Sequence, residues 1–243
     1  MHWIVRSLEE YPENATKRSL ATGTGFVIIG SLFMALAAGY ADAQSSAGAI
    51  KSEQRLDSSL EAPASHIWQA GIGEGFQPCA QSITFSAGAT YGVAAFGSLQ
   101  KHDLALASVT YGHMLGCTWA ENTCFRGNWE FRLELFAGAQ FSPSTEWIVG
   151  LTPHLRYNFA TGTRWVPFVD GGAGVTGTGI GEPDLRTTFE FNLQGGVGVQ
   201  WFIANNVSIN LEARYLHISN AGIKEPNLGL NGVTGLIGIS WFF

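Results

Sequence analysis

Charged residues, cysteines and long apolar runs are scarce in this sequence, and each shortage argues against a class of protein. Asp, Glu, Lys and Arg make up only 13% of the 243 residues, and the net charge of -6 argues against nucleic acid as a partner. The three cysteines have neither a histidine cluster nor CxxC spacing, which argues against a metal site. The apolar run at about 25–38 is shorter than the roughly 20 residues that a membrane-spanning helix needs.

The N-terminal region has the layout of a secretory signal peptide. Lys17 and Arg18 precede the apolar run, and Ala41-Asp42-Ala43 follows it. We predict a signal peptide over residues 1–43, cleaved after Ala43, in preference to a retained anchor. Residues 44–82 are then a polar lead-in that could contain one short strand at 67–75.

An exported chain meets an oxidising compartment, so its cysteines could pair. Cys117 and Cys124 flank the short stretch TWAENT between two strand-like runs, and they could close it with a disulfide. Cys79 would then be left over.

From residue 83 onward, apolar and polar residues alternate as they do in β-strands with one apolar face. In the stretch NWEFRLELFAGAQF, for example, Trp129 and Phe131 alternate with Glu130 and Arg132. The alternation predicts eight strands, at 83–97, 103–115, 127–141, 145–159, 165–178, 188–203, 206–219 and 231–243.

Two folds share this alternation, because a soluble sandwich turns its apolar faces toward each other and a membrane barrel turns them toward lipid. The signal peptide, the aromatic residues near the ends of runs, and strand lengths near or above about 9 to 11 residues favour the barrel. The chain also ends in ISWFF, with Phe243 last, which is typical of outer-membrane barrels. We therefore predict an all-β fold, an eight-stranded antiparallel transmembrane β-barrel of the outer membrane over residues 83–243.

The interior of an eight-stranded barrel is just wide enough for side chains, which argues against a small channel. Charged residues at even positions are expected to pair there, because a buried charge needs a partner. The segment GAGVTG at 172–177 fits GxGxxG, but no helix follows it, so nucleotide binding is not predicted. The charges expected to pair are Glu130, Glu134, Asp170, Glu190 and Glu212 with Arg132, Arg156 and Arg214.

His217 and Ser219 interrupt the apolar face of their strand. Odd positions such as Tyr215 carry the apolar residues, so the alternation turns both polar side chains toward lipid. Residues two apart in a strand point the same way, about 6.6 to 6.8 Å apart, so the histidine could activate the serine hydroxyl. Asn231 shares this face at the start of the last strand. With both termini on the periplasmic side, all three lie near the outer-leaflet rim, where the ester-linked acyl chains of lipopolysaccharide are within reach.

The segment HISNAGIKEPNLGLN, residues 217–231, closely resembles the active-site segment of the PagL-type lipid A 3-O-deacylases, and a looser resemblance covers roughly 127–243. It implies an outer-membrane serine esterase that acts on the position-3 ester of lipid A without metal or cofactor. It further implies that Ser219 is the nucleophile, His217 its general base, and Asn220 and the Gly222 N-H the oxyanion donors.

One position departs from the family pattern, because the best-known members carry a glutamate where this chain has Asn231. An amide oxygen can orient the histidine but cannot balance its positive charge, and Glu225 in the intervening loop could serve as a substitute acid. The alternative reading is therefore a weak or inactive barrel that binds lipopolysaccharide or supports the envelope. The sequence also leaves open whether two barrels form a homodimer that shelters the site.

Overall fold

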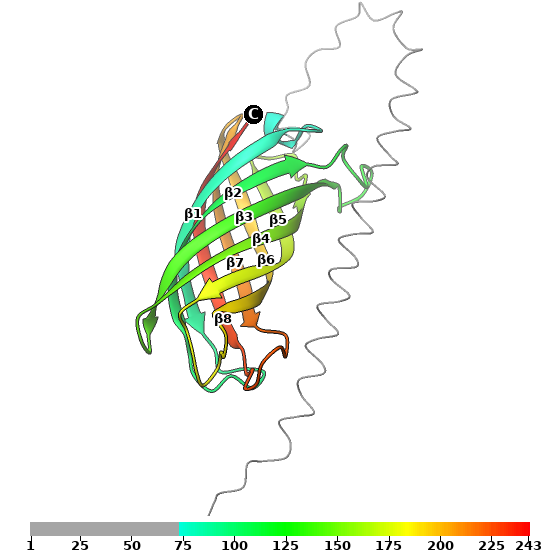
Figure 1. The fold of residues 1–243 in the computed structure, drawn as a ribbon. Helices are drawn as coiled ribbons and strands as arrows, with labels where there is room; N and C mark the ends of the chain where they lie inside the picture. Colours follow the sequence, from blue (N-terminus) through cyan, green and yellow to red (C-terminus); the bar gives the residue numbers. More distant parts are fainter. Residues whose placement is uncertain (1–72) are drawn as a thin grey trace, which may run out of the picture.

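Eight antiparallel strands form a closed barrel in the computed structural model, which describes residues 73–243 (Figure 1). Each strand pairs with the next along the chain and β8 pairs with β1, so the sheet has no free edge. A short 3-10 helix, η1 (Glu74–Phe76), precedes the barrel. The strands are β1 (Gln81–Gly92), β2 (Asp103–Met114), β3 (Gly127–Ser142), β4 (Glu146–Phe159), β5 (Trp165–Thr178), β6 (Phe189–Ala204), β7 (Val207–Ser219) and β8 (Leu230–Phe242).

The predicted eight-stranded barrel is confirmed, and its strand bounds differ most from the expected ones at the end of β1. That strand ends at Gly92 instead of continuing to residue 97. The chain leaves the barrel wall after Val93, whose N-H bonds the Asn231 carbonyl, and it turns at Phe96 and Gly97, both with positive φ. The apolar residues beyond Gly92 therefore belong to a loop, a difference that matters for the site.

The predictions for the N-terminal region fall mostly on residues that the structure does not describe. The signal peptide at 1–43 and the lead-in up to residue 72 lie outside the described part. The stretch 67–75 is described only from residue 73, and there the chain enters η1 instead of a strand. Among residues 73–243, no helix is long and apolar enough to cross a membrane.

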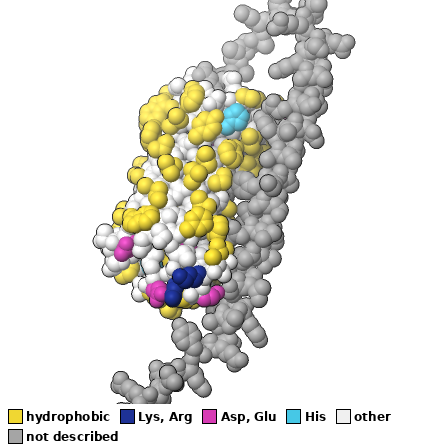
Figure 2. Space-filling model, viewed as in Figure 1, with side chains coloured by type: hydrophobic (Ala, Val, Ile, Leu, Met, Phe, Trp, Pro, Cys, Tyr) yellow, Lys and Arg dark blue, Asp and Glu magenta, His cyan; other side chains and the backbone are white. Residues whose placement is uncertain are grey.

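The strands turn even-numbered residues into the barrel and odd-numbered residues outward. On β3, Glu130 and Arg132 are buried, whereas Leu133 and Leu135 are exposed. Figure 2 shows hydrophobic side chains over the barrel wall and charged ones mostly toward the end opposite the C-terminus. An apolar exterior around a polar interior is the arrangement of a wall in contact with lipid.

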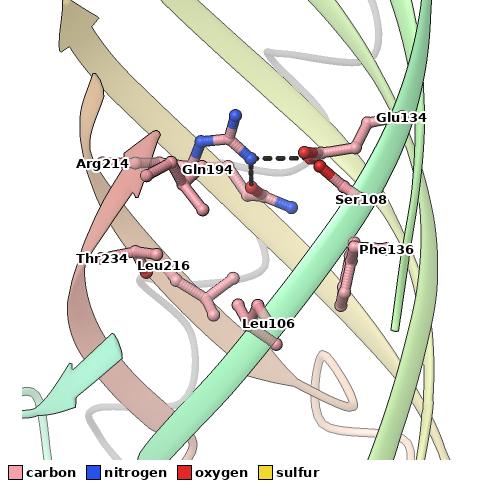
Figure 3. Close-up of a pocket in the computed structure, with 9 residues that line it drawn as sticks. Leu106, Ser108, Glu134, Phe136, Gln194, Arg214, Leu216 and Thr234 are labelled. Carbon is pink, nitrogen blue, oxygen red and sulfur yellow. Dashed lines mark hydrogen bonds and ion pairs between the residues drawn. The ribbon is translucent and has the colours of Figure 1, made fainter. Parts of the chain in front are cut away.

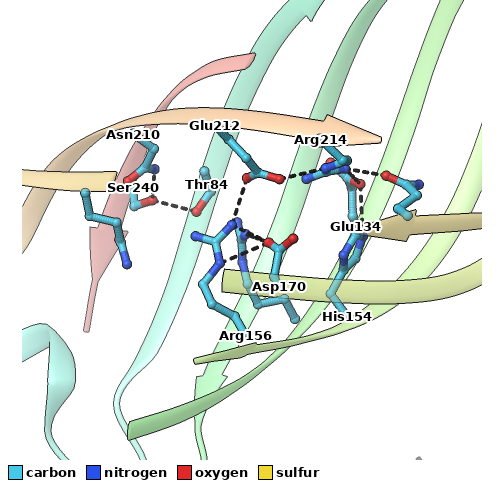
Figure 4. A network of polar contacts seen from close by, with 12 residues as sticks. Thr84, Glu134, His154, Arg156, Asp170, Asn210, Glu212, Arg214 and Ser240 are labelled. Carbon is cyan, nitrogen blue, oxygen red and sulfur yellow. Dashed lines mark hydrogen bonds and ion pairs between the residues drawn. The ribbon is translucent and has the colours of Figure 1, made fainter. Parts of the chain in front are cut away.

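The interior charges form the predicted network of ion pairs (Figure 4). Arg156 lies 2.7 Å from Asp170 and 2.8 Å from Glu212, and Arg214 lies 2.7 Å from Glu212 and 2.6 Å from Glu134. Each buried charge in this network thus has an opposite charge within contact distance, as burial requires. Glu190 differs from the prediction, because its Oε1 accepts from the N-H and the hydroxyl of Thr187 instead of pairing with an arginine.

Apolar clusters close both ends of the barrel interior. Near the C-terminus, Phe76 of η1 packs against Phe202 and Phe242. At the opposite end, which we call the rim, Leu185 of the β5–β6 loop (179–188) is buried among apolar strand residues. Between them lies a cavity of about 10 Å³, enough for about one water molecule (Figure 3). Side chains therefore fill the barrel, which argues against a channel. The cavity is lined by Leu106, Ser108, Glu134, Phe136, Gln194, Arg214, Leu216, Thr234 and Leu236.

The disulfide that the sequence allowed between Cys117 and Cys124 is not formed in the structure. Both are free and exposed, as is Cys79. Backbone bonds close the β2–β3 loop instead, because Trp119 and Gly127 each donate an N-H to the carbonyl of the other, at 2.6 and 3.1 Å. The loop holds its shape without the covalent link.

Candidate active site

The pairing of β7 with β8 places His217 directly opposite Asn231. The ring atom Nδ1 of His217 lies 2.8 Å from Oδ1 of Asn231. Ser219 follows two residues later on the same face of β7, and its Oγ lies 3.1 Å from Nε2 of the ring. Strand register alone therefore brings the three predicted residues into one hydrogen-bonded chain, here called the Ser-His-Asn chain.

Two neighbours fix which way the Asn231 amide points. Its Nδ2 donates to the carbonyl of Ala95 at 2.8 Å, which turns Oδ1 toward the histidine. The hydroxyl of Tyr215 donates to the same Oδ1 at 2.7 Å. The amide oxygen thus accepts two hydrogen bonds, and the orientation of the group is set on both sides.

The orientation of the amide determines the tautomer of His217. An amide oxygen can only accept, so Nδ1 carries the proton and Nε2 has a free lone pair. The Ser219 hydroxyl then donates to Nε2. A hydroxyl that donates to an imidazole lone pair is the arrangement that an activated serine nucleophile requires.

The Ser-His-Asn chain is less accessible than the strand pattern alone predicts. Its residues occupy odd, outward positions, yet Ser219 is 3%, His217 9% and Asn231 1% exposed. Part of the cover comes from the β1–β2 loop (93–102), which brings Ala95 to Asn231 and packs the Phe96 ring edge-on against Tyr215. The Ser-His-Asn chain therefore lies at the rim behind the β1–β2 loop, instead of fully facing lipid.

The two expected oxyanion donors lie at the start of the β7–β8 loop (220–229) and bond to each other. The Gly222 N-H donates to Oδ1 of Asn220 at 2.9 Å, and Nδ2 of Asn220 donates to the Lys224 carbonyl at 2.8 Å. Ala221 and Gly222 both have positive φ, so the backbone turns sharply just after Ser219. In this structure the Gly222 N-H is used within the loop.

Glu225 does not reach the position of a substitute acid. Its carboxylate accepts from the N-H of Asn227 at 3.1 Å and is exposed, whereas the Nδ1 side of His217 is bonded to Asn231. Among residues 73–243, no three His, Cys, Asp or Glu side chains are grouped so that they could hold a metal ion.

Tyr215 and the Ala95–Phe96 pair were not anticipated as parts of the site. Tyr215 shares the parity of His217 and lies two residues before it, so strand geometry could have identified it. No pattern in the sequence indicates the contact of Ala95 with Asn231, because the two residues are separated by 136 positions.

Fold and site together define an integral β-barrel that carries a hydrogen-bonded serine, histidine and asparagine at its rim. A family model described as "Lipid A 3-O-deacylase (PagL)" matches residues 106–240, so the chain belongs to the PagL family. That family assignment and the lipid-facing wall place it among the outer-membrane barrels.

Two relatives of known name agree with the assignment. The chain is 31% identical to "Lipid A deacylase PagL" of Bordetella bronchiseptica over 135 residues, 51% of this chain and 70% of that protein. It is 35% identical to "Lipid A deacylase PagL" of Pseudomonas aeruginosa over 85 residues, 34% of this chain and 46% of that protein. A crystal structure of the outer membrane enzyme PagL superposes with a TM-score of 0.45 at 20% identity, over 65% of this chain and 97% of the other.

Proposed function

We propose that this protein is a lipid A 3-O-deacylase of the outer membrane, a carboxylic ester hydrolase that uses Ser219 and His217. The observation that carries the proposal is the Ser-His-Asn chain, which lies at the rim within the segment that matches the family. The proposed reaction uses side chains of a single barrel, and whether two barrels form a homodimer is no part of the proposal.

The reaction begins when Ser219 Oγ attacks the ester carbonyl and its proton passes to Nε2 of His217. The bond between the carbonyl carbon and the sugar oxygen then breaks, and His217 returns the proton to that oxygen. Water attacks the acyl-serine, again giving a proton to His217, and the fatty acid leaves as Ser219 regains its hydrogen. Each bond formed or broken involves only the ester, water and these two side chains.

The oxyanion donors must be released from their mutual bond during this reaction. The Gly222 N-H now points to Asn220 Oδ1, and it has to turn to the developing negative charge on the carbonyl oxygen. Hydrogen bonds of a catalytic site often reach their final geometry only with substrate bound. We therefore assign Asn220 and Gly222 to a loop that adjusts when the ester binds.

The orientation of Asn231 favours an active enzyme over the inactive barrel. In a serine protease, exchanging the triad aspartate for asparagine costs about 10⁴ in rate because the histidine takes the wrong tautomer. Here Ala95 holds the NH₂ group, so the amide presents its oxygen and the tautomer is the productive one. Asn231 carries no negative charge. The lack of this charge slows the reaction without abolishing it.

Mass spectrometry of lipid A tests the proposal. Cells that express the protein should contain lipid A lighter by the acyl chain at position 3, and Ser219→Ala should lower this conversion by at least about 10³-fold. Ser108→Ala is a matched control, because Ser108 Oγ lies inside the barrel with no hydrogen-bond partner among the described residues. Unchanged lipid A in wild-type cells would favour the alternative, a barrel that binds lipopolysaccharide without cleaving it.

A further inference from the structure

Asp184 is a fully buried carboxylate at the rim, and it binds one of the two loops that border the site. It lies in the β5–β6 loop and is 0% exposed. Its oxygens accept from the N-H of Leu99 at 2.7 Å and of Gln100 at 2.8 Å, and Nε2 of His102 lies at 2.9 Å. A buried carboxylate is tolerated only with such partners, so these bonds fix the β1–β2 loop to Asp184.

The main chain of the same residue binds the other loop. The Asp184 carbonyl accepts from the N-H of Leu228 at 3.2 Å and of Gly229 at 3.1 Å, at the end of the β7–β8 loop. Gly229 has a φ of 78° and lies against His217, because a Cβ added there would be 2.9 Å from Cε1 of the ring. The carbonyl of Asp184 thus holds the backbone that packs against the imidazole.

Both loops contribute directly to the geometry of the Ser-His-Asn chain. The β1–β2 loop supplies the Ala95 carbonyl that orients Asn231. The β7–β8 loop supplies Gly229 beside His217 and runs from the end of β7 to the start of β8. Asp184 is not part of the Ser-His-Asn chain, yet it connects the two loops that set the positions of the Asn231 amide and the His217 ring.

We propose that Asp184 is a positioning residue for this site, which clamps the β1–β2 and β7–β8 loops so that Asn231 and His217 keep their mutual orientation. The inference rests on the proposed function. Within the described part of the chain, Asp184 forms no hydrogen bond with Ser219 or His217, so it acts through the loops and not on the ester. His102 extends the clamp to the barrel wall, since its Nδ1 lies 2.6 Å from Oε1 of Gln140 on β3.

Kinetics of the purified, refolded barrel on lipid A in detergent provide the first test. Asp184→Ala removes every side-chain bond to the β1–β2 loop, and kcat should fall about 100-fold with KM nearly unchanged, because displacement of reacting groups by about 1 Å costs that much. Asp184→Asn retains one acceptor oxygen, so its kcat should fall less than that of Asp184→Ala. The matched control is Glu182→Gln in the same loop, and it should behave as wild type. Its side chain is 60% exposed and forms an ion pair with Arg186.

A spectroscopic readout separates positioning from general stability and from the proposed function. In ¹⁵N NMR of histidine-labelled protein, the Nδ1-H signal of His217 should be sharp in wild type and in Glu182→Gln, and broadened by solvent exchange in Asp184→Ala. Asp184→Ala should also lower the urea midpoint, because the N-H groups of Leu99 and Gln100 lose their acceptor, so kcat is compared per folded molecule. An unchanged His217 signal with unchanged kcat would overturn the inference, as would a loss of kcat that merely follows a loss of folded protein. If Ser219→Ala keeps full activity, the proposed function fails, and the NMR signal still decides the role of Asp184.

Discussion

A single amide oxygen controls the orientation of His217, and its second hydrogen-bond donor is a tyrosine. Asn231 Oδ1 accepts from both His217 Nδ1 and the Tyr215 hydroxyl. Without the tyrosine, the Ala95 carbonyl alone would hold the amide in place. An asparagine in place of a carboxylate thus needs more neighbours to orient it, because its two ends are not equivalent.

Replacement of Tyr215 by phenylalanine tests this orientation. Tyr215→Phe removes one hydrogen bond, worth about 1 kcal/mol, so kcat should fall about fivefold. Tyr91→Phe is the matched control, because Tyr91 also faces outward near the rim and its hydroxyl accepts from Lys101 instead of contacting the site. Lipid A deacylation by the purified variants measures the difference, and equal rates for the two would show that Ala95 suffices to hold the amide.

The end of the β7–β8 loop limits the space around the His217 imidazole. Gly229→Ala should move the His217 ring, because the new Cβ would lie 2.9 Å from Cε1, and kcat should fall by about 100-fold. Gly116→Ala is a close control, since Gly116 also has a positive φ and no atom of residues 73–243 beyond its chain neighbours would lie within 4 Å of the added Cβ.

Both glycine variants should lose about 1–2 kcal/mol of unfolding free energy, the cost of a left-handed conformation for alanine. Urea unfolding measures this shared loss of stability, and kinetics measure the difference in kcat between the two variants. Equal activity of Gly229→Ala and Gly116→Ala would mean that the His217 ring tolerates the contact.

The strands could be predicted from the sequence, because alternation of apolar and polar residues is a local signal that records which face meets lipid. The same alternation placed His217 and Ser219 on one face and the charges of β3 inside. The chemical roles came from resemblance, since an isolated histidine and serine at the end of a strand do not identify a reaction.

The loops could not be predicted, because their contacts join residues far apart in the chain. The β1–β2 loop looked like a continuation of β1, and nothing local shows that Ala95 meets Asn231 or that Asp184 meets Leu99. The burial of the Ser-His-Asn chain depends on such contacts. For the same reason the sequence favoured neither the free Cys117 and Cys124 nor the disulfide between them.

The barrel keeps the ion pairs that stabilise it apart from the side chains of the proposed active site. The ion pairs of the interior lie between two apolar clusters, while the Ser-His-Asn chain lies on the outer side of β7 and β8. The two regions share strands but face opposite ways. Changes inside the barrel should therefore alter the free energy of unfolding more than the rate of the reaction.

Arg156→Met tests this separation. The arginine contacts Asp170 and Glu212 and stacks on the Phe168 ring at 3.5 Å, so its loss leaves two carboxylates without their closest common partner. Removing one side of a buried ion pair costs about 3–5 kcal/mol, whereas the exposed pair of Arg186 with Glu182 should contribute about 0–1 kcal/mol. Tryptophan fluorescence in urea should thus show a large shift for Arg156→Met and almost none for Arg186→Met. Deacylation per folded molecule should stay within about twofold of wild type in both, because His217 faces away from the interior, and a selective loss of rate in Arg156→Met would contradict the separation.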